Sequence, residues 1–185
     1  MRQDPSNWTP VTTERLLLRR LEPKDRRDSI RIHTDPAANL YNPDDFSTAA
    51  AEEKFEMFLA HWHREGFGYW AVAERGSPQT LIGFTGLHLG SVDGREILNL
   101  YYRYDPAVWG RGCATEGAIE AVRRGRAHLP KVPVLARTTD QNRPSQHTAL
   151  SAGLLRRAEL DRRSGSRLNM YFVLGWPGEN DGDAG

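Results

Sequence analysis

The sequence predicts a single mixed α/β domain, in which a central sheet carries helices on its faces. Its 185 residues fit one domain with a core of its own. Apolar residues alternate with period two in some stretches and recur with a helical period in others. Runs of neighbouring strands are followed by single helices, an order typical of a mixed sheet covered by helices.

The first elements follow from local signals. A strand is expected at residues 16–21, where three leucines are followed by two arginines and a further leucine. Pro23 then suits the first position of a helix, because its missing N–H would have no acceptor there. Ser47 or Thr48 can cap a second helix, in which four large apolar residues at positions i, i+3, i+4 and i+7 form one face. These residues are Phe55, Phe58, Leu59 and Trp62.

Three strands are expected next, at residues 69–74, 80–89 and 97–104, the first two joined as a hairpin. In the strand at 97–104, even-numbered side chains face one way and odd-numbered side chains the other. A helix rich in alanine and glycine follows at 112–126. The remaining elements are a strand at 132–137, a helix at 143–152, and strands at 155–160 and 168–174.

Composition bounds the class of protein. Residues 1–12 are polar and residues 177–185 acidic and glycine-rich, so we expect a flexible N-terminus, a domain at 13–176 and a disordered tail. A formal net charge of +1 gives no support for nucleic-acid or membrane binding through bulk charge. The single cysteine excludes an intramolecular disulfide, and no apolar stretch resembles a signal peptide or a membrane span. The expected location is the cytosol.

The most informative segment lies between the strand at 97–104 and the helix that follows it. There Gly110 and Gly112 are separated by one residue. A helix that begins directly after such a turn leaves several N–H groups without partners, which is a site for an anion. Glycine lets the anion approach the backbone closely. The spacing matches neither a dinucleotide-binding motif nor a P-loop, and the two glycines alone are equally consistent with a tight turn.

The segment from Trp109 to Ala118 resembles the cofactor-binding motif of the GNAT acetyltransferases. It is most similar to the RimJ/RimL-like branch, which acts on ribosomal-protein N-termini. Three further stretches are similar to that branch in the same order: Thr13 to Arg19, Asn142 to Ser145 and Ala152 to Leu154. The resemblance implies a mostly antiparallel sheet of about seven strands with helices on both faces. It also implies acetyl-CoA as the cofactor, an amine acceptor that is a protein N-terminus or a small molecule, and a monomer or homodimer.

The resemblance further implies the residues of the site. Backbone N–H groups from Arg111 to Thr115 would bind the pyrophosphate, and the main chain of the preceding strand would hold the pantetheine and the acetyl group. Ser145 would lie near the departing sulfur and is our candidate to protonate it. Our candidate to stabilise the oxyanion is a main-chain N–H in the segment from Tyr102 to Tyr104, with Tyr104 as the second catalytic residue. The implied cofactor residues are Tyr102, Arg103, Tyr104, Gly110, Arg111, Gly112, Cys113, Ala114, Thr115, Asn142 and Ser145.

The sequence departs from the family pattern at three positions. Ala149 stands where many relatives carry a proton-donating tyrosine, Asn99 where some carry a glutamate, and Ala107 where glutamine or arginine is common. An amine attacks only as the free base, so the site needs a proton acceptor. The candidates for that acceptor are Glu96, Asp105 and His88.

Other residues admit two interpretations. Cys113 at a helix N-terminus could be a nucleophile, but direct transfer is usual in the family, and we expect it here. Tyr41 and Phe46 are candidate contacts for the acceptor. The arginines of segment 123–126 are expected on a solvated helix face, or alternatively at the cofactor's 3′-phosphate. The six histidines show no metal-ligand spacing.

Two rival functions remain open at this point. One is a non-catalytic module that binds acyl-CoA as a sensor, which the absent tyrosine and glutamate favour. The other is an unrelated phosphate-binding α/β protein, which requires the four motifs to be coincidental.

Overall fold

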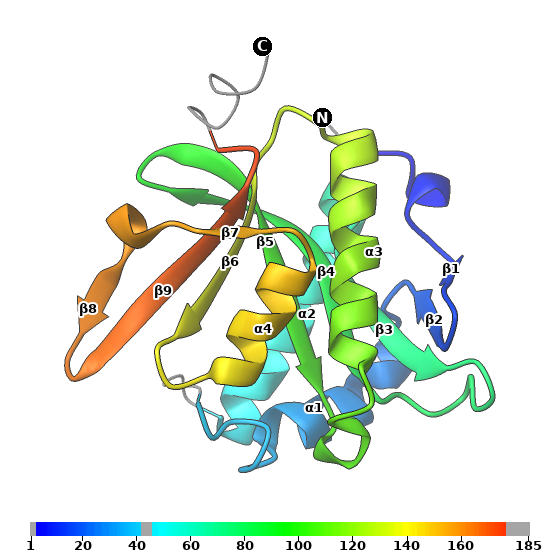
Figure 1. The fold of residues 1–185 in the computed structure, drawn as a ribbon. Coiled ribbons are helices and arrows are strands. Elements are labelled where there is room, and N and C mark those ends of the chain that lie inside the picture. Colours follow the sequence, from blue (N-terminus) through cyan, green and yellow to red (C-terminus); the bar gives the residue numbers. More distant parts are fainter. Residues whose placement is uncertain (1–2, 42–45, 177–185) are drawn as a thin grey trace.

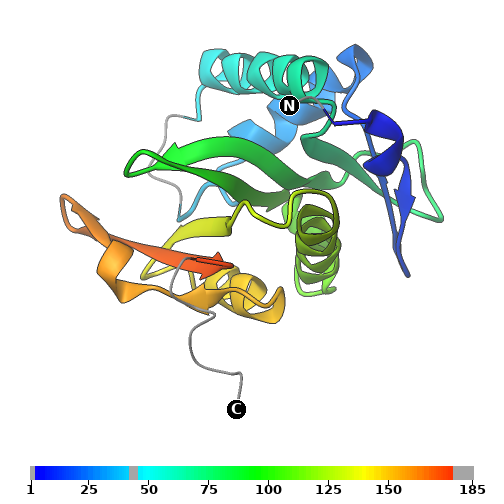
Figure 2. The ribbon, with the colours of Figure 1, turned by 90° about the horizontal axis from the view of Figure 1, so that it is seen from above.

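A computed structural model describes residues 3–41 and 46–176. In this part of the chain, a sheet of nine strands lies between two pairs of helices (Figures 1 and 2). The predicted fold class is confirmed, and the sheet has two more strands than the seven expected because two short ones form at its edges. The predicted disordered tail at 177–185 lies outside the described residues.

The elements occur in the following order. The helices are α1 (Arg26–Thr34), α2 (Thr48–Glu65), α3 (Cys113–His128) and α4 (Arg143–Ser151). The strands are β1 (Val11–Thr12), β2 (Leu16–Arg19), β3 (Tyr69–Glu74), β4 (Gly83–Val92), β5 (Arg95–Tyr104), β6 (Val134–Thr139), β7 (Leu155–Arg156), β8 (Arg162–Ser164) and β9 (Arg167–Leu174). Their order in the sheet is β1-β2-β3-β4-β5-β6-β9-β7, and β8 pairs with β9. The β5–β6 pair is parallel, and the other pairs are antiparallel.

The N-terminal segment differs from the prediction. Trp8 is fully buried. Its ring stacks on Phe67 with centroids 4.6 Å apart, and its carbonyl accepts a hydrogen bond of 2.7 Å from the indole of Trp70. The chain then adds β1 to the edge of β2. The flexible segment expected up to residue 12 is therefore not found over residues 3–12, because one large buried side chain anchors a stretch of polar composition.

The strand predicted at 155–160 is also wrong beyond its first two residues. After β7 the chain enters a 3-10 turn at Ala158–Leu160. This turn buries Leu160 in a small apolar cluster with Tyr171 and Val173 of β9. The packing of Leu160 against β9 therefore favours a turn at residues 158–160, where the local sequence favours an extended strand.

The helices cover the two faces of the sheet in pairs. Figure 2 shows α1 and α2 on one face and α3 and α4 on the other. The predicted apolar face of α2 is confirmed, since Phe55, Phe58 and Trp62 are buried. In α3, a Cβ added to Gly117 would lie 2.6 Å from the hydroxyl oxygen of Tyr104. The small residues therefore bring α3 close to β4 and β5, which fixes its N-terminus beside the end of β5.

The sheet opens between its two central strands. β5 and β6 are paired at Leu98–Val134 and Asn99–Leu135, whereas β6 stays paired with β9 as far as Thr139. Beyond residue 99, β5 keeps its pairing with β4 and diverges from β6. The divergence exposes one edge of β5 inside the molecule.

None of the helices formed by residues 3–41 and 46–176 has the length and apolar composition that crossing a membrane requires.

Candidate active site

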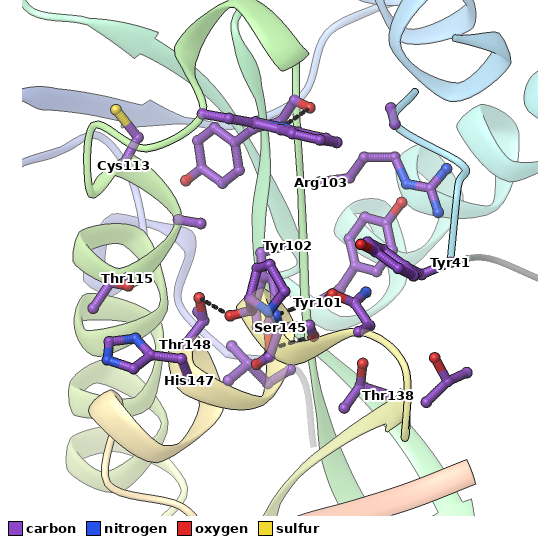
Figure 3. Close-up of a pocket in the computed structure, with 18 of the residues that line it drawn as sticks. Tyr41, Tyr101, Tyr102, Arg103, Cys113, Thr115, Thr138, Ser145, His147 and Thr148 are labelled. Atoms are coloured by element: carbon purple, nitrogen blue, oxygen red, sulfur yellow. Dashed lines mark hydrogen bonds between the residues drawn. The ribbon is translucent and has the colours of Figure 1, made fainter. Parts of the chain in front are cut away.

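A cavity of about 750 Å³ occupies the divergence of β5 and β6. In Figure 3, Tyr102 and Ser145 lie between Cys113 and Thr115 of α3 on one side and Tyr41 and Arg103 on the other. Ten of the eleven predicted cofactor residues line the cavity, and Arg111 does not. The ten are Tyr102, Arg103, Tyr104, Gly110, Gly112, Cys113, Ala114, Thr115, Asn142 and Ser145.

The glycine turn has the geometry that an anion site requires. Gly110 and Gly112 have φ angles of 72° and 79°, in the left-handed region that favours glycine. The Glu116 N–H donates to the carbonyl of Gly112 over 3.0 Å. This is the first hydrogen bond of the helix. The N–H groups of Cys113, Ala114 and Thr115 come before it in the chain and therefore have no acceptor within the helix. The turn is tight, and the residues that carry these N–H groups line the cavity together with Gly112.

The edge of β5 presents main-chain groups to the same cavity. The Leu98 N–H donates to Pro133, on the β6 side, and the Asp105 N–H donates to Ile82, on the β4 side, each over 2.8 Å. Because main-chain groups alternate in direction along a strand, even-numbered residues of β5 point theirs toward β6. Beyond residue 99 this direction leads into the cavity.

Because of this alternation, only some of the predicted residues of β5 direct their main-chain N–H groups toward the cavity. It directs the N–H groups of Tyr102 and Tyr104 into the opening, the orientation that the prediction requires. The prediction is wrong for the main chain of Arg103, which pairs with Phe84 of β4. Arg103 reaches the cavity with its side chain, which donates a hydrogen bond to Asn39.

Two hydroxyl groups meet in the middle of the cavity. The Tyr102 hydroxyl lies 2.8 Å from the carbonyl oxygen of Ser145 and 2.9 Å from its Oγ. Asn142 caps α4 by accepting a hydrogen bond from the Ser145 N–H, which fixes Ser145 in the first turn. Burial raises the pKa of Tyr102 to about 12, so this phenol stays protonated at neutral pH.

The family model of the acetyltransferase (GNAT) domain matches residues 15–155 of the chain. The chain belongs to the GNAT acetyltransferases. The predicted family and enzyme class are therefore confirmed.

Several solved structures share the fold of this GNAT domain. An acetyltransferase from Agrobacterium tumefaciens has a TM-score of 0.73 at 23% identity, over 87% of this chain and 92% of that one. Spermidine N-acetyltransferase from Vibrio cholerae, in complex with CoA and spermine, gives 0.70 at 17% identity, over 88% and 96%. Ribosomal-protein-S5-alanine acetyltransferase from Vibrio fischeri gives 0.66 at 11% identity, over 90% and 96%.

Ala149, at the position where the family pattern commonly has a tyrosine, does not face the cavity. Ala149 is fully buried in the main core and is not among the residues that line the cavity. The phenol beside Ser145 comes instead from β5, through Tyr102. Sequence reasoning assigned Tyr102 by its main chain and missed its side chain, although the alternation along β5 places that side chain on the α3 and α4 face.

None of the three proton acceptors considered from the sequence lines the cavity. Asp105 accepts from the Ala107 N–H and from Arg31, and these hydrogen bonds hold its pKa below the usual value. His88 stacks on His61, with ring centroids 3.7 Å apart. Glu96 is exposed near the far end of β5. Among the described residues, no aspartate or glutamate lines the cavity.

Across the cavity from α3 lies a second tyrosine side chain that sequence reasoning missed, that of Tyr101. The Tyr101 hydroxyl lies 3.0 Å from Nε2 of His33, whose Nδ1 lies 2.8 Å from the carbonyl oxygen of Ser29. Burial lowers the pKa of His33 to about 3, so the ring is neutral. Nδ1 then donates to Ser29, and Nε2 accepts the proton of Tyr101. Tyr41 also lines this side.

Three further residues named from the sequence have structural roles or lie elsewhere. Phe46 is 46% exposed and is not among the lining residues. Burial raises the pKa of Cys113, so its thiol is not activated as a nucleophile. Arg123 pairs with Glu120 on the same helix, as expected for a solvated helix face. Among the described residues, no cluster of side chains could hold a metal ion.

Proposed function

We propose that this GNAT domain transfers an acetyl group from acetyl-CoA to a primary amine by direct attack on the thioester. One observation supports the proposal above all. The N-terminal amides of α3, the inward amides of β5 and the Tyr102–Ser145 hydroxyl pair all face a single cavity. Anion binding, carbonyl polarisation and protonation of a leaving group are the three tasks that acetyl transfer from a thioester requires.

The residues present fit the cofactor. In the proposal, the amides from Gly112 to Thr115 hold the pyrophosphate, since a helix N-terminus binds anions through its N–H groups and its dipole. A Cβ added to Gly110 would meet no atom within 4 Å, so the space beside Gly110 is open. The edge of β5 offers the N–H groups of Tyr102 and Tyr104 to the pantetheine and the acetyl group.

Main-chain and side-chain groups of the cavity have separate tasks in this mechanism. Acetyl-CoA supplies the thioester whose carbonyl carbon the amine attacks. An inward N–H of β5, at Tyr102 or Tyr104, donates to the carbonyl oxygen as negative charge develops on it. The Ser145 hydroxyl, hydrogen-bonded to Tyr102, protonates the departing sulfur. The amine loses its proton to water, and water returns a proton to Ser145 after the sulfur departs. Among the described residues, no aspartate or glutamate lines the cavity to accept the amine's proton directly.

Thermal unfolding with candidate ligands tests the function. Acetyl-CoA at a hundred times its dissociation constant should stabilise the protein by about 2.7 kcal/mol, whereas ATP and NAD should not. Release of free thiol with a panel of amines then measures transfer. Stabilisation without thiol release would favour a non-catalytic sensor, and stabilisation by ATP or NAD instead of acetyl-CoA would overturn the proposal.

The hydroxyl pair gives a second prediction. Ser145→Ala and Tyr102→Phe should each lower kcat about tenfold to a hundredfold, with little change in KM for acetyl-CoA, because each removes part of one proton-donating unit. The double variant should lose little more than the worse single variant, since residues that act as a unit are not additive. Tyr171→Phe, on β9 outside this cavity, is the matched control. Unchanged kcat in both single variants would contradict the assignment.

We further propose that the acceptor is a protein N-terminus, as in the RimJ/RimL-like branch. The order of the motifs at residues 13–19, 142–145 and 152–154 supports this, together with the fold shared with a ribosomal-protein acetyltransferase. Thiol release with short peptides carrying free N-termini, compared with spermidine and other small amines, tests it.

A further inference from the structure

The Thr13–Arg15 turn before β2 contacts the first turn of α3 at Glu116, and none of Thr13, Arg15 and Glu116 lines the cavity. Arg15 donates from its Nε to Oε2 of Glu116 over 2.6 Å and from its main-chain N–H to Oε1 over 2.8 Å. Thr13 donates to the same Oε1 over 2.5 Å. A further bond of 2.7 Å runs from Nη1 of Arg15 to the carbonyl oxygen of Arg111. Neither Arg15 nor Arg111 lines the cavity, although Gly112 does.

The bond to the Arg111 carbonyl determines where the next N–H points. The C=O of Arg111 and the N–H of Gly112 belong to one trans peptide unit, in which they point in opposite directions. Because Arg15 holds the carbonyl on the outer side, the Gly112 N–H is directed to the cavity side. Glycine adopts positive and negative φ with similar ease, so the backbone alone does not prevent this peptide from turning over.

Charge gives Arg15 a second task. Burial by itself would raise the pKa of Glu116, but hydrogen bonds from Thr13 and Arg15 bring it below the usual value. Glu116 is therefore a carboxylate in the first turn of the helix whose N-terminus faces the cavity. Such a charge opposes the binding of an anion there. The guanidinium of Arg15 offsets it.

We propose that Arg15 is a positioning residue for pyrophosphate binding. It holds the Arg111–Gly112 peptide with its N–H toward the cavity and compensates the charge of Glu116. The family-like motif at residues 13–19 would then act in the cofactor site, although it lies about a hundred residues before the glycine turn. It rests on the proposed function, because it assumes that the turn binds the pyrophosphate of CoA.

Calorimetric titration with CoA tests the proposal. Arg15→Met keeps the length of the side chain but removes its charge and donors, and it should weaken CoA binding about tenfold to a hundredfold. The value of kcat/KM with acetylpantetheine, which lacks the pyrophosphate, should stay at the wild-type level. Arg26→Met, which removes a surface ion pair with Glu56, should leave CoA affinity unchanged. Arg15→Met/Glu116→Gln should recover part of the lost affinity, because the uncompensated carboxylate is gone.

The outcomes separate the two proposals. If the wild-type protein fails to bind CoA, the proposed function fails. If it binds CoA and Arg15→Met binds equally well, the positioning role of Arg15 is wrong. Equal losses with CoA and acetylpantetheine would show a general structural role and would also overturn it. Should Arg15→Met fail to fold, Arg15→Lys keeps the charge but cannot reach Glu116 and Arg111 together, and it should weaken CoA binding selectively.

Discussion

Replacing Gly112 by aspartate is expected to weaken CoA binding more than about a hundredfold while the protein still folds. The residue has a φ of 79°, where a side chain is strained by about 1–3 kcal/mol. An added Cβ would lie 3.1 Å from Nη2 of Arg15, so the new carboxylate would compete with Arg111 and Glu116 for that guanidinium. It would also add negative charge at a helix N-terminus that must receive a pyrophosphate.

Titration calorimetry with CoA measures this loss, and thermal unfolding followed by circular dichroism checks the fold. Gly153→Asp is a matched control. Gly153 also has a left-handed φ, of 87°, and a Cβ there would meet no atom within 4 Å. The Gly153→Asp variant therefore introduces similar backbone strain at a position that does not line the cavity. CoA affinity close to that of the wild type in Gly112→Asp would mean that the anion binds elsewhere, and the proposed cofactor site would be wrong.

Trp8→Ala is expected to lower the free energy of unfolding by about 3–5 kcal/mol, the usual cost of removing a large buried aromatic side chain. Trp8 is fully buried and stacks on Phe67. Truncation would leave a cavity between the N-terminal segment and the loop after α2. The variant should also release residues 3–12, which proteolysis would detect.

Urea unfolding of Trp8→Ala and wild-type protein gives the difference directly. Asn7→Ala, at the exposed neighbouring position, should change stability by less than about 0.5 kcal/mol, as most surface substitutions do. A loss below about 1 kcal/mol in Trp8→Ala would show that this segment is not part of the folded core.

Local features of the chain were predicted well. Ser47 and Gly66 bound α2 because a cap and a left-handed glycine act on the adjacent turn. The positive φ angles of Gly110 and Gly112 likewise follow from residues close in sequence. The edges of the sheet were predicted less well, since the 3-10 turn at Ala158–Leu160 and the short β1 depend on distant packing.

The sequence by itself determined the order of the main elements, the glycine turn before α3 and, through resemblance, the family. These depend on dihedral angles, periodicity and spacing within short segments. The tertiary structure alone decided which side chains share the cavity: Tyr102 meets Ser145 across 43 positions of sequence, and Arg15 meets Glu116 across 101. It also excluded Glu96, Asp105 and His88 from the cavity walls. Such contacts arise because the packing of α3 and the divergence of β5 from β6 bring distant segments together, and no local pattern encodes them.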